Sequence, residues 1–129
     1  MRIGVVGYGV RASSLMGYVP QLDPDSRVVA IADPGIERIK TQLKDEAEHI
    51  LFYENIDEML DSAPLDGVVI GTRCDLHTEM ALKVLERNLT LFLEKPVATT
   101  YSDLTRLKSA YEASQSQVVV SFPLRNTPL

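Results

Sequence analysis

Hydrophobic residues alternate along the chain between short uninterrupted runs and longer segments in which they recur every three or four positions. Uninterrupted runs of Val, Ile and Leu are typical of parallel strands that helices cover on both faces. Spacings of three and four indicate helices that bury one stripe of side chains. Strands are predicted for six runs, at residues 2–6, 27–32, 50–53, 67–71, 90–93 and 117–122.

Helices are predicted between these strands, at residues 12–19, 35–48, 56–61, 76–87 and 102–114. Asp75 and Ser102 are the predicted N-caps of the fourth and fifth helices. Regular alternation of strands and helices is typical of an α/β protein with a parallel sheet. The pattern therefore predicts a doubly wound Rossmann fold over residues 1–122, with helices on both faces and a ligand crevice at the carboxyl ends of the strands.

Composition narrows the classes of partner. The chain has 13 basic and 18 acidic residues, and its basic residues are scattered, which argues against nonspecific binding to nucleic acid. No apolar stretch reaches the length of a membrane span, and the residues after Met1 resemble a strand rather than a secretion signal. The single cysteine, Cys74, excludes an internal disulfide and fits a reducing compartment. We therefore expect a cytoplasmic protein without nucleic-acid, membrane or metal partners.

A glycine-rich turn follows the first predicted strand. Residues 7–12, GYGVRA, match the dinucleotide-binding pattern G-x-G-x-x-A, and we call them the glycine loop. In this pattern the first glycine permits the tight turn, the second lets the backbone approach a pyrophosphate, and the small third residue lets the helix pack closely. The arginine of the loop either contacts the pyrophosphate or lies in solvent. The candidate cofactor-binding residues of the loop are Gly7, Tyr8, Gly9, Val10, Arg11 and Ala12.

An acidic residue, Asp33, follows the second predicted strand. It stands 24 residues after Gly9, near the position at which dinucleotide folds place the carboxylate that binds the adenosine ribose. Such a carboxylate accepts a hydrogen bond from the 2′-hydroxyl and repels a 2′-phosphate. The sequence therefore predicts NAD as cofactor in preference to NADP.

A further motif, LFLEKPVATT, ends the fifth predicted strand. It follows VVGYG, VVAIADP, DGVVIGT and LHTEMALKVLERN in a fixed order. Through this ordered set the chain resembles the N-terminal NAD(P)-binding domain of the Gfo/Idh/MocA family (glucose-fructose oxidoreductase, inositol dehydrogenase and rhizopine catabolism protein). The resemblance implies that Lys95 is catalytic, beside the nicotinamide and the reacting carbon, with Glu94 as its support. A lysine at the end of a strand is compatible with acid–base work there.

The resemblance also assigns the loop after the fourth strand to the cofactor. Gly71, Thr72 and His77 become candidate cofactor contacts, together with Glu94 and Lys95. A histidine at this place is equally well a helix-start residue that is hydrogen-bonded to its surroundings, so both roles stay open for His77.

Family members continue into a second α/β domain that shapes a sugar pocket and often forms the oligomer interface. This C-terminal substrate domain is absent from the chain, and residues 123–129, with Arg125 and Pro128, resemble the exit segment that leads to it. By itself the first domain is expected to catalyse little, because it cannot position both reactants.

Three functions follow from the resemblance. The leading one is the NAD(P)-binding domain of a homo-oligomeric oxidoreductase that transfers a hydride between nicotinamide and a sugar, polyol or related secondary alcohol or ketone. The second is an NAD-retaining glycosidase of the same family, for which Arg11 in the glycine loop is a weak match. The third is a non-catalytic regulator that senses NAD(P). The presence of Lys95 argues mildly against this function, because a sensor does not need a proton-transfer lysine.

Overall fold

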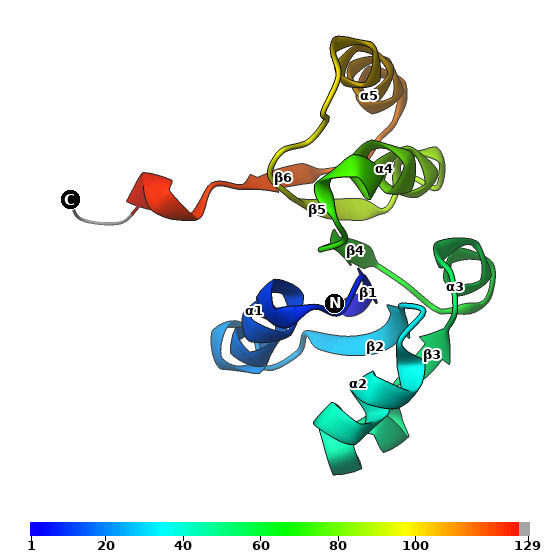
Figure 1. Ribbon diagram of the computed structural model, residues 1–129, viewed down its shortest axis with the longest axis vertical. Helices are drawn as coiled ribbons and strands as arrows, with labels where there is room; N and C mark the ends of the chain where they lie inside the picture. The colour runs from blue at the N-terminus through cyan, green and yellow to red at the C-terminus, as the bar shows by residue number, and fades with distance from the viewer. Residues whose placement is uncertain (127–129) are drawn as a thin grey trace.

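Six parallel strands form one sheet in the order β3-β2-β1-β4-β5-β6 (Figure 1). The computed structural model describes residues 1–126. The chain starts in the middle of the sheet, extends it on one side through β2 and β3, and then returns to the other side of β1. The strands are β1 (Arg2–Val6), β2 (Arg27–Ala32), β3 (Leu51–Tyr53), β4 (Gly67–Ile70), β5 (Thr90–Glu94) and β6 (Val118–Ser121).

Helices connect the strands and cover both faces of the sheet. In Figure 1, α1 lies to the left of β1 and β2, whereas α3 lies to the right of them and α4 above them. This arrangement confirms the predicted doubly wound α/β fold with six strands. The α-helices are α1 (Val10–Leu22), α2 (Ile36–Leu43), α3 (Ile56–Ser62), α4 (His77–Glu86) and α5 (Tyr101–Ala113), and the 3₁₀ helices are η1 (Lys44–His49), η2 (Cys74–Leu76) and η3 (Pro123–Asn126).

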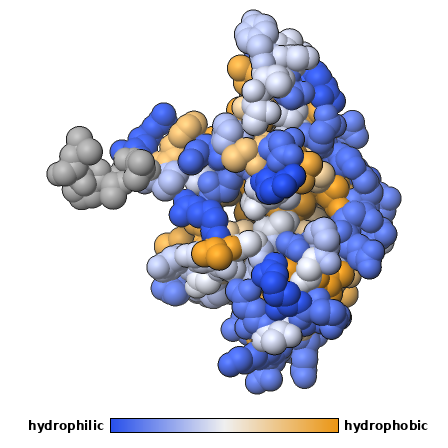
Figure 2. Space-filling view, viewed as in Figure 1, coloured by the Kyte–Doolittle hydropathy of each residue, from blue (hydrophilic) through white to orange (hydrophobic). Residues whose placement is uncertain are grey.

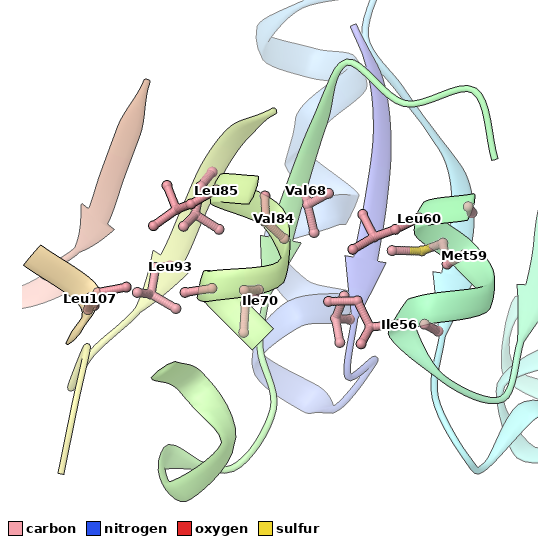
Figure 3. Packing of buried hydrophobic residues seen from close by; sticks show 14 residues of the cluster. Ile56, Met59, Leu60, Val68, Ile70, Val84, Leu85, Leu93 and Leu107 are labelled. Atoms are coloured by element: carbon pink, nitrogen blue, oxygen red, sulfur yellow. The ribbon is translucent and has the colours of Figure 1, made fainter. Parts of the chain in front are cut away.

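Neighbouring residues of the strands face two separate cores. Val5 and Ile31 pack in one core with Met16 of α1 and Ile39 of α2. The other core is larger, because three helices contribute to it. Figure 3 shows this second cluster, in which α3, α4 and α5 close over the sheet with Ile56, Met59, Leu60, Val84, Leu85 and Leu107 against Val68, Ile70 and Leu93.

The outer surface is mixed in polarity. Figure 2 shows polar residues over most of the visible face, with hydrophobic residues in separate patches. Because the helices bury the strand residues on both faces of the sheet, the polar sides of the helices are exposed to solvent.

Two helices end three or more residues away from the predicted position. The first continues past Val19 to Leu22, and Pro20 lies inside its last turn, where the missing N–H removes only one hydrogen bond. The second ends at Leu43, because Lys44 has a φ of +53° and the chain then continues as the 3₁₀ helix η1.

The predicted N-caps of the fourth and fifth helices are wrong. Asp75 lies within η2, and α4 begins after it at His77 without a side-chain cap. Thr100 rather than Ser102 caps α5, because its Oγ1 accepts a hydrogen bond of 3.1 Å from the Asp103 backbone N–H. Where several polar residues are adjacent at the start of a helix, the sequence does not determine which of them is the N-cap, and the position can differ by one or two residues.

An ion pair ties the amino ends of β1 and β4 together. Asp66 accepts hydrogen bonds from the backbone N–H of Arg2 at 2.7 Å and from its guanidinium at 2.8 Å. These bonds hold the pKa of the Asp66 carboxyl well below its ordinary value. They fix the edge of the sheet opposite to the carboxyl ends of the strands.

Candidate functional site

The carboxyl ends of the strands bring the predicted site residues to one edge of the sheet, which we call the carboxyl edge. Asp33 follows β2, Gly7 follows β1, Gly71 follows β4 and Lys95 follows β5. The strands are adjacent in this same order. From β1 the chain adds strands first toward β3 and then, on the other side of β1, toward β6. In doubly wound sheets a ligand crevice opens at such a reversal of the strand order.

Gly7 and Gly71 allow a close approach of the chain at this reversal. Gly7 has a φ of +78°, and a Cβ there would lie 2.8–2.9 Å from atoms of Thr72. A Cβ on Gly71 would lie 2.9 Å from the Cβ of Ala12. Only glycine fits both positions, and the small side chain of Ala12 lets α1 pack against the end of β4.

Gly9 has the opposite surroundings. It is the N-cap of α1, and, apart from its two neighbours in the chain, none of the described residues has an atom within 4 Å of a Cβ built on it. No side chain caps α1, and its first turn contains no acidic residue. The first backbone N–H groups of a helix attract anions, because they are unpaired and lie at the positive end of the helix dipole. This open, uncapped helix start fits the pyrophosphate of a dinucleotide.

Asp33 is held in place by the backbone around it. Its Oδ2 accepts a hydrogen bond of 2.9 Å from the Tyr8 N–H, and its Oδ1 accepts one of 2.7 Å from the Gly35 N–H. The Arg38 guanidinium lies 3.9 Å from Oδ1. Because each carboxylate oxygen can accept more than one hydrogen bond, the group keeps capacity for a ligand hydroxyl.

The side chains of Tyr8 and Val10, two predicted residues of the glycine loop, differ in their exposure. The Tyr8 ring is 6% exposed and packs in the core beside α1 and α2, so that only its backbone reaches Asp33. Burial, with a smaller effect of Glu46, raises the pKa of the Tyr8 phenol. Val10 is 89% exposed at the first position of α1.

His77 lies buried between the loops that follow β4 and β5. Its ring nitrogens are 2.7 Å from the Pro96 carbonyl oxygen and 3.0 Å from the Thr72 carbonyl oxygen. A neutral imidazole donates one of these bonds and an imidazolium donates both. Next to it, the Thr78 hydroxyl donates to the Val97 carbonyl at 3.2 Å. Since the His77 side chain is 1% exposed, its position matches the helix-start role.

Replacing His77 with alanine should lower the free energy of unfolding by about 2–4 kcal/mol, because it removes the bonds to both loops and leaves a cavity. Urea denaturation measures this change. The exposed His49 offers a control, and His49→Ala should change stability by less than about 0.5 kcal/mol. A loss below about 1 kcal/mol in His77→Ala would show that the ring does not hold the loops together.

Glu94 and Arg11 form an ion pair that the sequence did not predict. Glu94 is 7% exposed at the end of β5, and its Oε1 accepts a hydrogen bond of 3.0 Å from Arg11 Nε. A second guanidinium nitrogen lies 3.5 Å from the Ser121 hydroxyl, at the end of β6. The only sequence signal is an arginine in the glycine loop and an acid closing a buried strand, and the strand order brings them together.

Lys95 is exposed next to this pair and forms no salt bridge with any residue of the described range 1–126. Its peptide bond to Pro96 is cis. A hollow of about 450 Å³ is lined by Lys95, Phe122, Pro123 and Arg125. The Arg125 guanidinium lies 4.9 Å from the centre of the Phe122 ring. Pro128 of the predicted exit segment lies outside the described residues.

Comparison with known proteins shows to which family the chain belongs. The model of the oxidoreductase family with an NAD-binding Rossmann fold, Gfo/Idh/MocA, matches residues 1–122. The chain belongs to the Gfo/Idh/MocA family. It is thus an NAD-binding oxidoreductase domain, as the resemblance of its motifs predicted.

Relatives of this Gfo/Idh/MocA domain are longer proteins. The inositol 2-dehydrogenase of Acidiphilium cryptum is 29% identical over 119 residues, which are 92% of the chain and 35% of that protein. The inositol 2-dehydrogenase of Paracoccus denitrificans is 26% identical over 99% of the chain and 38% of its own length. The chain therefore spans about a third of the length of the curated relatives it matches.

Solved structures agree with the fold. The WlbA dehydrogenase from Bordetella pertussis, in complex with NADH and UDP-GlcNAcA, superposes with a TM-score of 0.85 at 25% identity, covering 98% of the chain and 38% of that structure. A dehydrogenase from Chromobacterium violaceum gives a TM-score of 0.81 at 29% identity, covering 93% of the chain and 35% of that structure.

Residues 1–126 of this Gfo/Idh/MocA domain were also compared with the requirements of a metal site, a disulfide and a membrane-spanning helix. No group of three His, Cys, Asp or Glu side chains in that range could hold a metal ion. Cys74 is exposed and unpaired with another cysteine. None of the helices in that range is long and apolar enough to cross a membrane.

Proposed function

We propose that this domain binds NAD in preference to NADP through the glycine loop and Asp33. The observation that carries the proposal is the Asp33 carboxylate, which the Tyr8 and Gly35 N–H groups hold at the end of β2. A dinucleotide whose pyrophosphate lies at the start of α1 directs its adenosine ribose toward the end of β2. There the carboxylate accepts hydrogen bonds from the ribose hydroxyls and repels a 2′-phosphate.

NADH should bind the chain at least about tenfold more tightly than NADPH, a difference of about 1.4 kcal/mol. Fluorescence titration of the 129-residue chain with each dinucleotide measures the two affinities. Asp33→Asn should weaken NADH binding and reduce the preference, because the repulsive charge is gone. Glu112→Gln removes an equal charge from α5 and should leave both affinities unchanged. Absence of a response to either dinucleotide would contradict the cofactor proposal, and equal affinities would contradict the role of Asp33.

We further propose that the complete protein oxidises a secondary hydroxyl of a sugar or polyol, or reduces the corresponding ketone. The bound nicotinamide supplies the hydride chemistry. Lys95 is proposed to hold the substrate oxygen through its Nζ and to exchange a proton with it. Its support is the position of Lys95, which is exposed at the carboxyl edge and forms no ion pair with another of residues 1–126.

The names of the relatives support this substrate class. Two of them are inositol 2-dehydrogenases, and inositol is a polyol. A solved relative holds NADH together with UDP-GlcNAcA. Net formation of NADH with a polyol or sugar would distinguish an oxidoreductase from a glycosidase, which releases a hydrolysed sugar without net redox change. A regulator would show neither product and would respond to the dinucleotide alone.

A further inference from the structure

Two cations line one hollow at the carboxyl edge. The hollow has a volume of about 450 Å³, and its lining residues are Lys95, Phe122, Pro123 and Arg125. The lysine follows β5 and the other three residues follow β6, which pairs with β5. The side chains of Lys95 and Arg125 are exposed, and neither forms a salt bridge with another of residues 1–126. Two like charges that face one small space repel each other, and an anion bound between them removes this repulsion.

The acids nearest in the fold are already paired. Up to residue 126, the loops that follow β4, β5 and β6 contain three cations and one acid. This acid, Asp75, lies 3.2 Å from the Arg73 guanidinium. Glu94, which ends β5, accepts its hydrogen bond of 3.0 Å from Arg11. These loops therefore carry a positive charge that no acid within them balances, although the chain as a whole has a formal net charge of -5.

The Arg125 guanidinium is oriented by an aromatic ring. It lies 4.9 Å from the centre of the Phe122 ring, and its side chain forms no hydrogen bond with another of residues 1–126. A guanidinium that stacks on a ring occupies its flat face and keeps the N–H groups of its edge for a ligand. Two parallel N–H groups of this edge match the two oxygens of a carboxylate.

We propose that Arg125 binds a carboxylate of the substrate while Lys95 Nζ holds the substrate oxygen that reacts. This inference rests on the proposed catalytic function of Lys95, and it narrows the substrate class to sugar acids and related polyhydroxy acids. Because both cations line the same hollow, one small molecule can contact them together. Phe122 and Pro123 offer an apolar wall to its carbon skeleton.

Two matched sugars test whether a carboxylate is recognised. Glucuronate carries a carboxylate where glucose has a hydroxymethyl group. Each is titrated into the 129-residue chain at constant ionic strength, and NMR follows the backbone amide signals of Lys95, Phe122 and Arg125. Glucuronate should shift these signals with a Kd of about 1–10 mM, and glucose should bind at least about tenfold more weakly. Glucose 6-phosphate is titrated in the same way, because a phosphate is the other anion that two cations attract.

Substitution of the arginine tests its part in this binding. Arg125→Gln should weaken glucuronate binding at least about fivefold and leave the response to glucose unchanged. Arg125→Lys should recover only part of the affinity, because it keeps the charge but loses the paired N–H groups. Arg27→Gln is the matched control, because it removes an exposed arginine without a salt bridge in residues 1–126 from the amino end of β2, and it should change neither affinity. None of these titrations needs the cofactor or turnover, so their failure is distinguishable from failure of the NADH titration.

Four results would overturn the proposal. Equal binding of glucose and glucuronate, or no shift with glucuronate, would show that the hollow does not recognise a carboxylate. Unchanged glucuronate affinity in Arg125→Gln would exclude the arginine from the site. Binding of glucose 6-phosphate at least about tenfold tighter than that of glucuronate would assign the two cations to a phosphate. Displacement of glucuronate by NADH would assign the hollow to the cofactor.

Discussion

Replacing Lys95 with alanine should lower kcat of the complete protein by about 10²–10⁴-fold, the range that a positioned proton-transfer group contributes. Binding of NADH to the 129-residue chain should change by less than about threefold, because the glycine loop and Asp33 are the residues proposed to hold the dinucleotide. Lys95 is exposed, so its removal leaves no cavity and the chain should fold normally. Steady-state kinetics and the NADH titration give the two quantities.

Lys108→Ala is the matched control for this change. It removes an exposed lysine from α5, whose partner Glu112 is also exposed. We expect neither kcat nor NADH binding to respond to it. If Lys95→Ala kept the full rate, the lysine would be a surface residue. If it lost NADH binding in parallel with kcat, the lysine would bind the cofactor rather than assist the proton transfer.

Gly9→Ala should strongly weaken dinucleotide binding while leaving the fold intact. The Cβ of the variant would project into the open space before α1 and keep a pyrophosphate from the backbone there. We expect the affinity for NADH to fall at least about 100-fold, or about 2.7 kcal/mol. The free energy of unfolding should change by less than about 1 kcal/mol, because the φ of −79° at this N-cap suits alanine.

Gly7→Ala should show the reverse order of effects. Its φ of +78° and the atoms of Thr72 within 2.9 Å of a Cβ should lower the free energy of unfolding by about 3 kcal/mol. Urea denaturation and NADH titration of the two variants measure both quantities. Equal destabilisation by the two substitutions would contradict the packing described at Gly7. Unchanged NADH affinity in Gly9→Ala would place the pyrophosphate elsewhere.

Periodicity alone was sufficient to predict the fold. The uninterrupted hydrophobic runs correspond to all six strands, because a parallel strand covered on both faces has no polar side to interrupt it. Helix ends were less predictable. The first helix is predicted to end at residue 19 but continues to Leu22, because the one hydrogen bond that Pro20 removes does not stop the helix. Cap choice between Thr100 and Ser102 likewise depends on which hydroxyl the folded turn aims at the Asp103 N–H.

The candidate site, too, could be predicted from the sequence only in part. Local sequence identified the glycine loop and Asp33, because a tight turn and an acid after a strand are properties of short segments. It did not show that the Tyr8 ring belongs to the core, that His77 joins Thr72 to Pro96, or that Arg11 pairs with Glu94. Each of these contacts joins segments that the order of strands in the sheet makes neighbours.

By itself the sequence determined the elements, their alternation, and the residue types available for chemistry at the strand ends. Tertiary structure alone decided which of these residues meet. The physical reason is that hydrophobic periodicity records how each segment buries its own side chains, whereas the pairing of Arg11 with Glu94 follows from β4 lying between β1 and β5. That order is settled by packing of the whole sheet, which no single segment encodes.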